Sequence, residues 1–507
     1  MANDTDVLIV GAGPTGLVLA LWLHRLGVKL RIIDKAATPG ETSRALAVHA
    51  RTLELYDQVG LAEAVVAAGR EMDGARLWVR GRQRARFRFG DVGGGLSPYP
   101  FAVSYPQDAH ERLLGDRLAQ AGIEVERPVE LTGFETDSDG VTARLRRSDG
   151  SEGTIGAAYL AGCDGARSVV RETIKAGFPG GTYSRLFYVA DVEAEGPVVN
   201  GELNAALDTA DFLAVFPMRG EGRIRLVGDI EREEGAAELS FADVGQGVIE
   251  RLALNIRRVN WFSTYRVHHR VADTWRAGRA FLLGDAAHIH SPVGGQGMNT
   301  GIGDAINLAW KLAAVLAGNA PPELLDTFEP ERIAFARRLV ASTDRAFTFI
   351  SQNGPLARFV RLVLVPIILP AAFAVQAVRR LIFRSVSQIN VNYRGMALSE
   401  GAAGKVRAGD RLPWTGEGGP DNFAPLKRLA WQGQVHGVPS ADVTAACAAA
   451  GLALTTFPWS EAAARAGLAR DAFHLVRPDG YLALVAANDA ARGLAAYQAL
   501  HGLKFGL

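Results

Sequence analysis

The stretch Val7-Leu8-Ile9-Val10-Gly11-Ala12-Gly13-Pro14-Thr15-Gly16 decides the fold of this 507-residue chain. Its first four residues are apolar and have the composition of a buried strand. The pattern G-x-G-x-x-G follows, and an apolar helical pattern then extends from Leu17 to Leu26. A second apolar run, Val28 to Ile33, ends at Asp34. This order of strand, glycine turn, helix, strand and acid predicts a Rossmann-type βαβ unit that binds a dinucleotide.

The three glycines of the turn have separate roles. Gly11 permits a tight turn, Gly13 lets the backbone approach a pyrophosphate, and Gly16 lets the helix pack closely against the strand. A glycine turn that serves only packing is the competing interpretation, and the complete strand-turn-helix-strand context argues against it.

The residues around the glycines complete the predicted site. Pro14 and Thr15 lie where the helix begins, and its free N–H groups and positive dipole end favour phosphates there. Asp34 and the following Lys35 come about 20 residues after the glycines, where a carboxylate accepts hydrogen bonds from ribose hydroxyls. The motif alone does not distinguish FAD from NAD.

Two later segments distinguish the dinucleotides. An apolar run ends in Cys163-Asp164-Gly165-Ala166-Arg167-Ser168, and a second run, Ala280 to Leu283, ends in Gly284-Asp285. A strand of an open α/β sheet presents such a carboxylate at its ligand-binding end. The loop Ser291-Pro292-Val293-Gly294-Gly295-Gln296-Gly297-Met298-Asn299 then leads into a helix. Its backbone N–H groups suit a flat polar ring.

These three separated motifs, in this order, resemble the FAD-dependent aromatic hydroxylases, the single-component flavoprotein monooxygenases. The resemblance covers nearly the whole chain and is strongest to the phenol, pentachlorophenol and aromatic polyketide hydroxylases. It implies cofactor contacts from Gly11, Gly13, Pro14, Thr15, Gly16, Asp34, Lys35, Arg44, Gln107, Asp164, Gly165, Asp285, Pro292, Gly295, Gly297, Met298 and Asn299. It also implies three positions at the site of catalysis, which are Leu46, Pro292 and Gly295.

The resemblance implies a reaction as well as a cofactor. In this family NAD(P)H, as NADPH or NADH, binds transiently and reduces FAD, and a C4a-hydroperoxyflavin formed with O₂ hydroxylates an aromatic substrate. The sequence agrees, because a chain with two dinucleotide domains would usually show a second G-x-G-x-x-G, which is absent here. The absence of any Cys-x-x-Cys argues against a disulfide-reductase flavoprotein.

The chain departs from some relatives at one position. They carry His or Asp two residues after the arginine that matches Arg44, and this chain has Leu46. A phenol-activating base at that place is therefore in doubt, and an already activated, polyketide-like ring is favoured. We expect Leu46 to line the substrate pocket.

Several alternatives stay open. Baeyer–Villiger oxygen insertion on a polycyclic ketone would use the same fold, and a non-catalytic FAD-binding partner protein is a different class. A flavin-dependent halogenase is disfavoured because the motif Trp-x-Trp-x-Ile-Pro is absent. An alkene reductase would be separated from an oxygenase by the mass of its product.

Composition excludes other functions. A formal net charge of +1 gives no indication of nucleic-acid binding, and two cysteines exclude a disulfide scaffold. Neighbouring His268 and His269 alternate faces on a strand, so we expect no metal site.

A polar N-terminus without a targeting pattern predicts a cytoplasmic protein, and a homodimer is a possible assembly. The uncharged stretch Leu362 to Val378 is too short to span a bilayer, and we expect a buried or domain-bridging helix rather than membrane contact.

The expected fold class is α/β, with four consecutive parts. Residues 1–175 and 274–398 form an interrupted Rossmann-type FAD domain with a helical connector. Residues 176–273 form an antiparallel substrate sheet, with strands at Phe212 to Pro217 and Arg223 to Ile230. Residues 399–507 resemble the thioredoxin-like domain of the phenol hydroxylase branch, and Phe473 to Val485 is expected to form a hairpin around Pro-Asp-Gly. Without Cys-x-x-Cys, that domain is structural or oligomeric.

Overall fold

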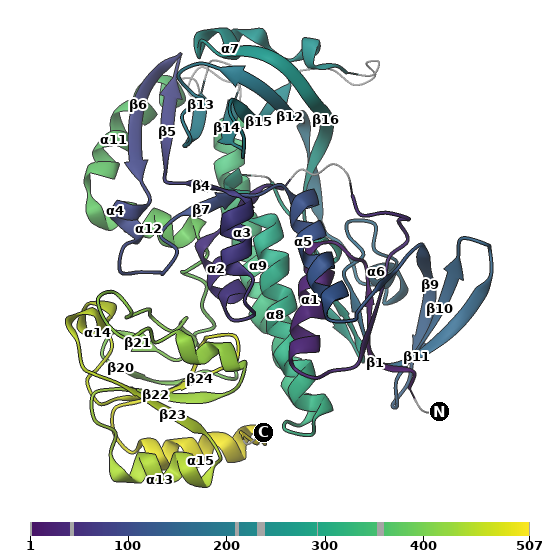
Figure 1. The fold of residues 1–507 in the computed structure, drawn as a ribbon, viewed down its shortest axis with the longest axis vertical. Coiled ribbons are helices and arrows are strands. Elements are labelled where there is room, and N and C mark those ends of the chain that lie inside the picture. The colour runs from purple at the N-terminus through teal and green to yellow at the C-terminus, as the bar shows by residue number, and fades with distance from the viewer. Residues whose placement is uncertain are drawn as a thin grey trace.

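The structure is a computed structural model that describes residues 3–40, 45–207, 212–230, 239–291, 293–351 and 359–505. A largely parallel sheet carries the N-terminal motif (Figure 1). Its parallel strands lie in the order β18 (Ala280–Leu282), β11 (Glu152–Gly162), β1 (Thr5–Val10), β2 (Leu30–Ile33) and β8 (Val125–Glu126). Antiparallel partners are β17 (Arg276–Ala277), β10 (Val141–Arg147) and β9 (Val129–Thr136).

Long helices cover this sheet. α1 (Pro14–Arg25) begins at a proline, which suits the first helical position because its missing N–H has no partner there. The helix stops before Gly27, whose φ of 77° is a conformation that glycine adopts readily. α8 (Gly297–Leu316) and α5 (Gln107–Gln120) pack against α1. Trp22 of α1 is fully buried between these elements.

A second, mainly antiparallel sheet lies above the first in Figure 1. The predicted strands β14 (Phe212–Pro217) and β15 (Arg223–Ile230) are present. Its full order is β19 (His288–Ile289), β16 (Asn255–Val271), β12 (Gly180–Glu195), β15, β14, β13 (Leu203–Leu207), β5 (Gly74–Val79) and β6 (Arg82–Arg88). Three of these strands, β5, β6 and β19, come from outside residues 176–273. α7 (Gln246–Arg251) covers the outer face of the sheet.

A small sheet connects the two large ones. It contains β3 (Ala47–Val48), β7 (Ala102–Ser104) and β4 (Arg70–Met72). Two helices, α2 (Ala50–Asp57) and α3 (Ala62–Ala68), lie between β3 and β4 in the chain. β3 therefore passes from the nucleotide-binding edge of the first sheet toward the underside of the second.

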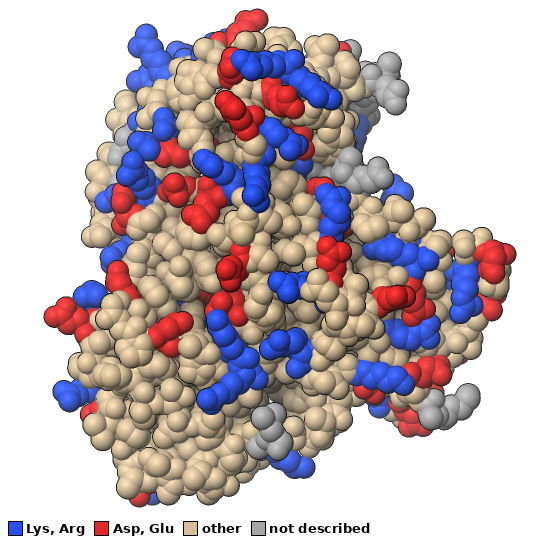
Figure 2. Space-filling model, in the orientation of Figure 1, with Lys and Arg blue, Asp and Glu red and all other residues tan. Residues whose placement is uncertain are grey.

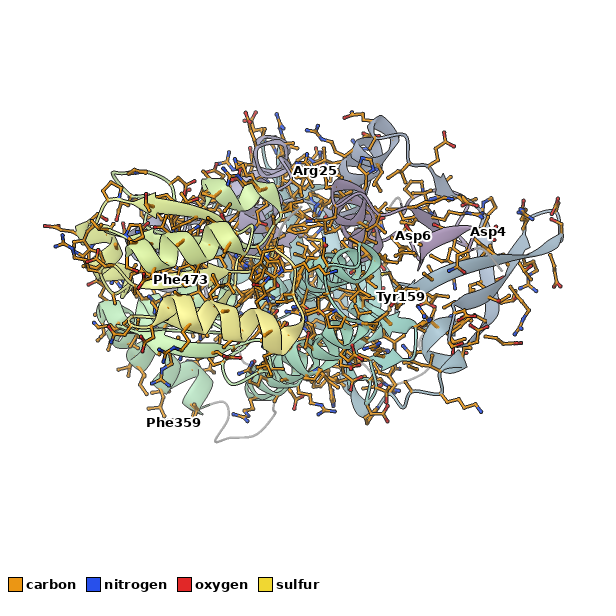
Figure 3. The ribbon with its side chains drawn as sticks, turned by 90° about the horizontal axis from the view of Figure 1, so that it is seen from below. Asp4, Asp6, Arg25, Tyr159, Phe359 and Phe473 are labelled. Atoms are coloured by element: carbon orange, nitrogen blue, oxygen red, sulfur yellow. The ribbon has the colours of Figure 1, made fainter. Side chains whose placement is uncertain are left out.

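The C-terminal residues form a separate sheet with helices on it. The strand order is β21 (Val406–Arg407), β20 (Glu400–Ala403), β25 (Leu482–Ala486), β24 (Phe473–Val476), β22 (Gln432–His436) and β23 (Ala453–Phe457). The helices are α13 (Ala441–Ala449), α14 (Glu461–Ala466) and α15 (Ala490–His501). Figure 3 shows two of these helices in front of the sheet that carries Phe473. The predicted hairpin around Pro-Asp-Gly is present as β24 and β25.

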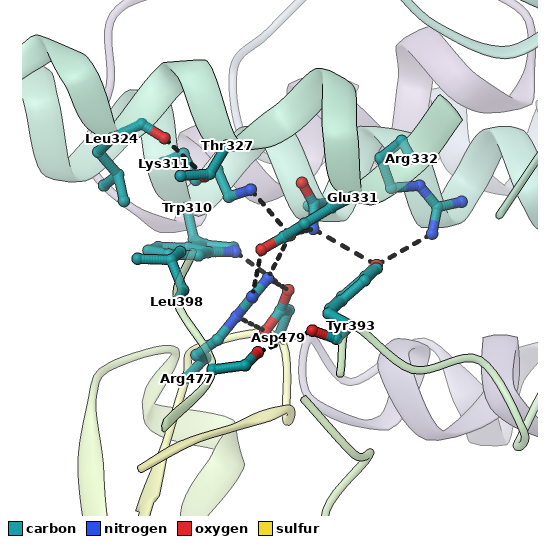
Figure 4. A network of polar contacts seen from close by, with 12 residues as sticks. Trp310, Lys311, Leu324, Thr327, Glu331, Arg332, Tyr393, Leu398, Arg477 and Asp479 are labelled. Atoms are coloured by element: carbon teal, nitrogen blue, oxygen red, sulfur yellow. Dashed lines mark hydrogen bonds and ion pairs between the residues drawn. The ribbon is translucent and has the colours of Figure 1, made fainter. Parts of the chain in front are cut away.

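A buried ion network joins this C-terminal unit to the first sheet's helices (Figure 4). Arg477 donates to Glu331 of α9 (Phe328–Ser351) through Nη1 at 2.8 Å and Nη2 at 3.0 Å, and also pairs with Asp479. Lys311 Nζ lies 2.9 Å from Glu331 Oε2. Trp310 Nε1 donates to Asp479 Oδ2 at 3.1 Å. The charges balance within the network, which allows them to be buried.

The connector between α9 and the C-terminal unit is helical, as a bridging segment would be, but it is not buried as a whole. It consists of a π-helix (Val360–Leu364), α11 (Val365–Ala374) and α12 (Gln376–Val386). Ile367 and Ile368 in its uncharged stretch are 65% and 58% exposed. No helix in the described ranges is long and apolar enough to cross a membrane. On the face shown in Figure 2, basic and acidic side chains are interspersed.

Candidate active site

The predicted cofactor residues follow four neighbouring parallel strands. β18, β11, β1 and β2 are adjacent, and their carboxyl ends lead into Asp285, Asp164, the Gly11 turn and Asp34 respectively. Neighbouring strands lie about 4.8 Å apart, so these turns line one edge over about 15 Å. An edge of this kind accommodates a long ligand such as a dinucleotide.

The β1–α1 turn combines two crowded glycines with one open glycine. A Cβ on Gly11 would lie 2.3 Å from the carbonyl oxygen of Cys163, and one on Gly16 would lie 2.0 Å from that of Gly11. A Cβ on Gly13 would meet nothing within 4 Å. Gly13 is also the N-cap of α1, and no side chain caps the helix. The open space around Gly13 and the N–H groups at the start of α1 therefore lie at the same place, where a pyrophosphate is expected.

Asp34 is positioned by the turn that it follows. Its Oδ2 accepts from Ala12 N at 2.7 Å and its Oδ1 from Ala36 N at 2.8 Å. Arg127, which the sequence did not indicate, forms an ion pair with Asp34 at 3.2 Å. Each carboxylate oxygen accepts more than one hydrogen bond, so ribose hydroxyls can still bind. Lys35 is exposed beside it.

Asp164 and Asp285 lie in adjacent turns but in different environments. Asp164 accepts from Ser168 Oγ at 2.6 Å and Val170 N at 3.1 Å, and burial raises its pKa. Asp285 is exposed at the edge of the site. Arg171 joins the two turns by donating to the carbonyls of Ala286 and Ala166 at 2.9 and 2.8 Å. Gly165, with φ 77°, has open space around it.

Thr15 packs where three predicted elements meet. A Cβ on Gly284 would lie 2.6 Å from Thr15 Oγ1, and one on Gly301 of α8 would lie 2.4 Å from the same atom. These glycines therefore let α8 and the Gly-Asp turn approach the start of α1. Pro14, next to Thr15, is buried.

Residues at the start of α2 form hydrogen bonds with the glycine loop that follows β19. His49 Nε2 lies 2.9 Å from the carbonyl oxygen of Gly294, and burial lowers the pKa of His49 to about 4. Asn299 Nδ2 donates to the carbonyl of Gly295 at 3.0 Å, and its Oδ1 accepts from His49 N and Thr52 Oγ1. The amide of Asn299 is thus used internally, so a cofactor contact would come from its backbone. Gly297 and Met298, both half-buried, begin α8.

A buried carboxylate supports the Gly-Asp turn. Asp304 of α8 accepts from Gly284 N at 3.1 Å and lies 2.7 Å from His288 Nε2. Arg332 Nε donates to it at 2.7 Å, and the ion pair keeps the pKa of Asp304 low despite burial. Arg332 Nη1 also donates to Tyr393 Oη at 3.0 Å, which connects the turn to the network of Figure 4.

Two predicted residues, Arg44 and Pro292, lie outside the described residues. Leu46 is buried, and its carbonyl accepts from Tyr105 N at 2.7 Å. Gln107 begins α5 and donates to Glu111 at 2.8 Å. The roles of these residues toward cofactor or substrate stay predictions.

The face of the antiparallel sheet opposite α7 is apolar, and we call it the inner face. Ala214, Val227 and Val189 are direct cross-strand neighbours on β14, β15 and β12 and form one buried cluster. Partly buried aromatic residues surround the cluster, namely Phe212, Phe216, Trp261 and Tyr265. β16 of this sheet pairs with β19, which leads into the glycine loop. This face is suited to a flat, apolar ligand.

One ion pair interrupts that apolar face. Arg225 donates to Asp191 through Nε at 2.6 Å and Nη2 at 2.8 Å, and the side chain of Arg225 is 2% exposed. Its Nη1 reaches the carbonyl of Ala45 at 3.4 Å, beside Leu46. Phe216 and Trp261 flank the pair in the same cross-strand row. The sequence did not indicate Arg225, because no local pattern shows what a strand faces.

The described ranges contain no group of three or more His, Cys, Asp or Glu that could hold a metal ion. The groups that are present fit FAD: backbone N–H groups beside open glycines can donate to its phosphates, and carboxylates can accept from its hydroxyls.

Comparison with known proteins identifies the family. Residues 4–343 match the family model described as FAD binding domain. The chain is 38% identical over 403 residues to 6-methylpretetramide 4-monooxygenase of Streptomyces rimosus, covering 78% of this chain and 70% of that protein. The solved anhydrotetracycline hydroxylase of Streptomyces rimosus superposes with TM-score 0.78 and 30% identity over 99% of both chains.

One solved structure matches only part of the chain. The structure of p-nitrophenol 4-monooxygenase from Pseudomonas putida DLL-E4 has TM-score 0.69 and 25% identity. The alignment covers all of that structure but only 78% of this chain. The chain belongs to the FAD-dependent aromatic hydroxylase family, and it is an FAD-binding oxidoreductase.

Proposed function

We propose that this protein is an FAD- and NAD(P)H-dependent monooxygenase that hydroxylates a planar, polycyclic phenol of the aromatic polyketide type. The apolar inner face of the antiparallel sheet carries the proposal. It offers the row Ala214, Val227 and Val189 between aromatic side chains, and β16 of the same sheet pairs with β19, which leads into the glycine loop. The compounds in the names of two relatives, 6-methylpretetramide and anhydrotetracycline, are polycyclic and flat enough to lie against such a face.

Bound FAD supplies the chemistry, which is the reductive activation of O₂ for transfer of one oxygen atom to an electron-rich ring. This chain's residues bind the ring, orient it and exclude water. The buried valines of the inner face replace the hydration of the ring, while Phe216 and Trp261 restrict its tilt. The loop around Gly295, held by His49 and Asn299, keeps backbone N–H groups in fixed positions near the reacting centre.

Arg225 lies at the edge of the apolar face, near Leu46, which provides no base. Its guanidinium cannot accept a proton and is paired with Asp191, so it neither deprotonates the substrate nor adds net charge to the site. The N–H groups that Asp191 does not use can donate to an oxygen atom of the bound ring. Arg225 is therefore a positioning residue for the substrate oxygen.

The domain organisation completes the proposal. Residues 1–175 and 274–398 are the two halves of the FAD domain, and 176–273 with β5, β6 and β19 hold the substrate. Residues 399–507 are a thioredoxin-like unit without redox cysteines; its one cysteine, Cys447, is buried. The separate six-stranded sheet that these residues form, which begins with β20 at Glu400, supports the last boundary.

The test is product analysis with purified, FAD-loaded protein. We expect NADPH oxidation to accelerate with polycyclic phenols and the product to gain 16 mass units, with NMR separating a ring hydroxyl from a Baeyer–Villiger lactone. Val227→Phe should abolish the stimulation without loss of FAD, because Val227 lies on the inner face and is 9% exposed. The matched control is Val259→Phe, at a site on β16 that is 39% exposed. Equal stimulation in both variants contradicts the assigned substrate face.

A further inference from the structure

The connector before the C-terminal unit carries an unusual row of exposed apolar side chains. Phe359, Val363 and Ile367 are 51%, 41% and 65% exposed, and Ile368 is 58% exposed. The first three follow one another at intervals of four residues, so they share one side of the π-helix and α11. Figure 3 places Phe359 at the outer edge of the molecule. We call these four residues the apolar stripe.

The opposite side of the same helices is apolar too, and it is covered. Leu362 packs against the cluster of Leu77, Val79 and Ala85 on β5 and β6. α11 lies beside β6 in Figure 1 and carries no charged residue. A helix that is apolar on all sides is stable when both sides leave water. Here the described part of the chain covers only the inner side.

The segment of the sequence that carries the stripe is basic. The 55 residues between Asp344 and Glu400 contain seven arginines and no aspartate or glutamate. Arg380 and Arg384 of α12 are exposed, and Arg379 is half-buried. None of these three arginines has a carboxylate partner among the described ion pairs.

The apolar stripe and the arginines together favour one kind of partner. Arginines meet anionic headgroups while apolar side chains enter the boundary of the acyl chains, as in helices that lie in a membrane interface. A second copy of this chain across a two-fold axis would instead bring arginine clusters of the same charge together. The basic surroundings therefore favour a lipid surface over a homodimer.

We propose that the apolar stripe and the arginines of α12 dock this enzyme peripherally on an anionic lipid surface. The stripe adjoins the edge of the antiparallel sheet, because the helices that carry it pack on β5 and β6. Docking would bring that edge to the bilayer, where a lipophilic aromatic compound is concentrated. This last purpose rests on the proposed function, but the docking itself does not.

The test is co-sedimentation of the full-length, FAD-loaded enzyme with vesicles at low ionic strength. We expect binding to vesicles that contain phosphatidylglycerol and much weaker binding to pure phosphatidylcholine. Ile367→Ser with Ile368→Ser should weaken partitioning about tenfold or more, because two apolar side chains are lost from the contact. Arg380→Gln with Arg384→Gln should weaken it roughly tenfold and reduce its dependence on salt. The matched control, Val438→Ser with Leu500→Ser, changes two residues that are each 71% exposed in the C-terminal unit and should bind normally.

Two outcomes overturn the inference. One is equal sedimentation of the wild type and the stripe variant, or sedimentation of neither. The other is a dimer, detected by light scattering, that dissociates in the stripe variant, since that result assigns the stripe to a second copy. The flavin spectrum confirms that each variant is folded. Because turnover is not part of the readout, loss of the proposed reaction would leave the docking result intact, and the reverse also holds.

Discussion

Glu331 is the most informative position at which to test the interface between the first sheet's helices and the C-terminal unit. Its carboxylate is 1% exposed and accepts from Arg477, from Lys311 Nζ at 2.9 Å and from Asn307 Nδ2 at 2.7 Å. Glu331→Gln keeps the shape of the side chain and removes its charge. Two buried cations then lose part of their compensation.

The size of the effect can be obtained in two ways. The neighbouring cations lower the pKa of Glu331 from 4.5 to about 2, against the opposing effect of burial. At about 1.4 kcal/mol per pKa unit, the charged carboxylate contributes roughly 3 kcal/mol to the free energy of unfolding. Removing one partner of a buried ion pair typically costs about 3 to 5 kcal/mol. Both routes give the same order of magnitude.

Urea unfolding followed by tryptophan fluorescence measures this loss, since Trp310 donates to Asp479 within the same network. Hydrogen exchange of β24 shows whether the C-terminal unit opens first. The lowered pKa of Glu331 also predicts how its contribution to the free energy of unfolding depends on pH. The contribution is complete above pH 4.5, the ordinary pKa, and it is lost as the pH falls through about 2. The difference between wild type and variant should therefore be constant at neutral pH and decrease below pH 4.5.

The control is Glu461→Gln in the same C-terminal unit, where the side chain is 93% exposed and a surface ion pair contributes little. We expect that change to alter the free energy of unfolding by less than about 0.5 kcal/mol. If Glu331→Gln is equally mild, or if its effect does not decrease in acid, the carboxylate does not stabilise the interface as described.

The remaining predictions concern the glycine turn and the buried histidines. Gly13→Val should leave the apoprotein's melting temperature nearly unchanged but lower FAD affinity at least tenfold in a fluorescence titration, because the site around Gly13 is open. Gly16→Ala should also destabilise the apoprotein, by about 1 to 3 kcal/mol in urea, because its Cβ would lie 2.0 Å from the Gly11 carbonyl oxygen. Burial lowers the pKa of several histidines to about 4, so unfolding takes up protons and the urea midpoint should fall between pH 6.5 and 4. These residues are His49, His110, His290, His436 and His474. Replacing His110 by Phe should reduce that pH dependence by one proton, and an unchanged profile would contradict its burial as a neutral ring.

Local patterns predicted the elements that depend on neighbouring residues. The βαβ unit, the strands ending in Asp164 and Asp285, and the hairpin around Pro-Asp-Gly are present, and β14 and β15 have the predicted bounds. In each of these the period of apolar residues and the turn chemistry agree over a short span.

Features that depend on distant residues could not be predicted in the same way. The predicted cofactor contact of Asn299 stays a prediction, but the sequence did not show that its side-chain amide bonds to His49 and Ala47, about 250 positions away. Arg225 and Glu331 appear as ordinary charges in the sequence, and only the fold brings their partners together. The apolar stretch around Ile367 was expected to form a buried or domain-bridging helix, and hydropathy alone does not show which sides of such a helix are covered.

The pairing of β5 with β13 also has a consequence for synthesis of the protein. Residues 75–79 have their partners at 203–207, and β1 lies beside β11, which in turn pairs with β18 near residue 280. A ribosome therefore releases both sheets in fragments, and the N-terminal half exposes unpaired strand edges until β18 and β19 have emerged, the last of them at Ile289. The first 300 residues should thus fold late and together, with chaperone binding concentrated on chains shorter than that length.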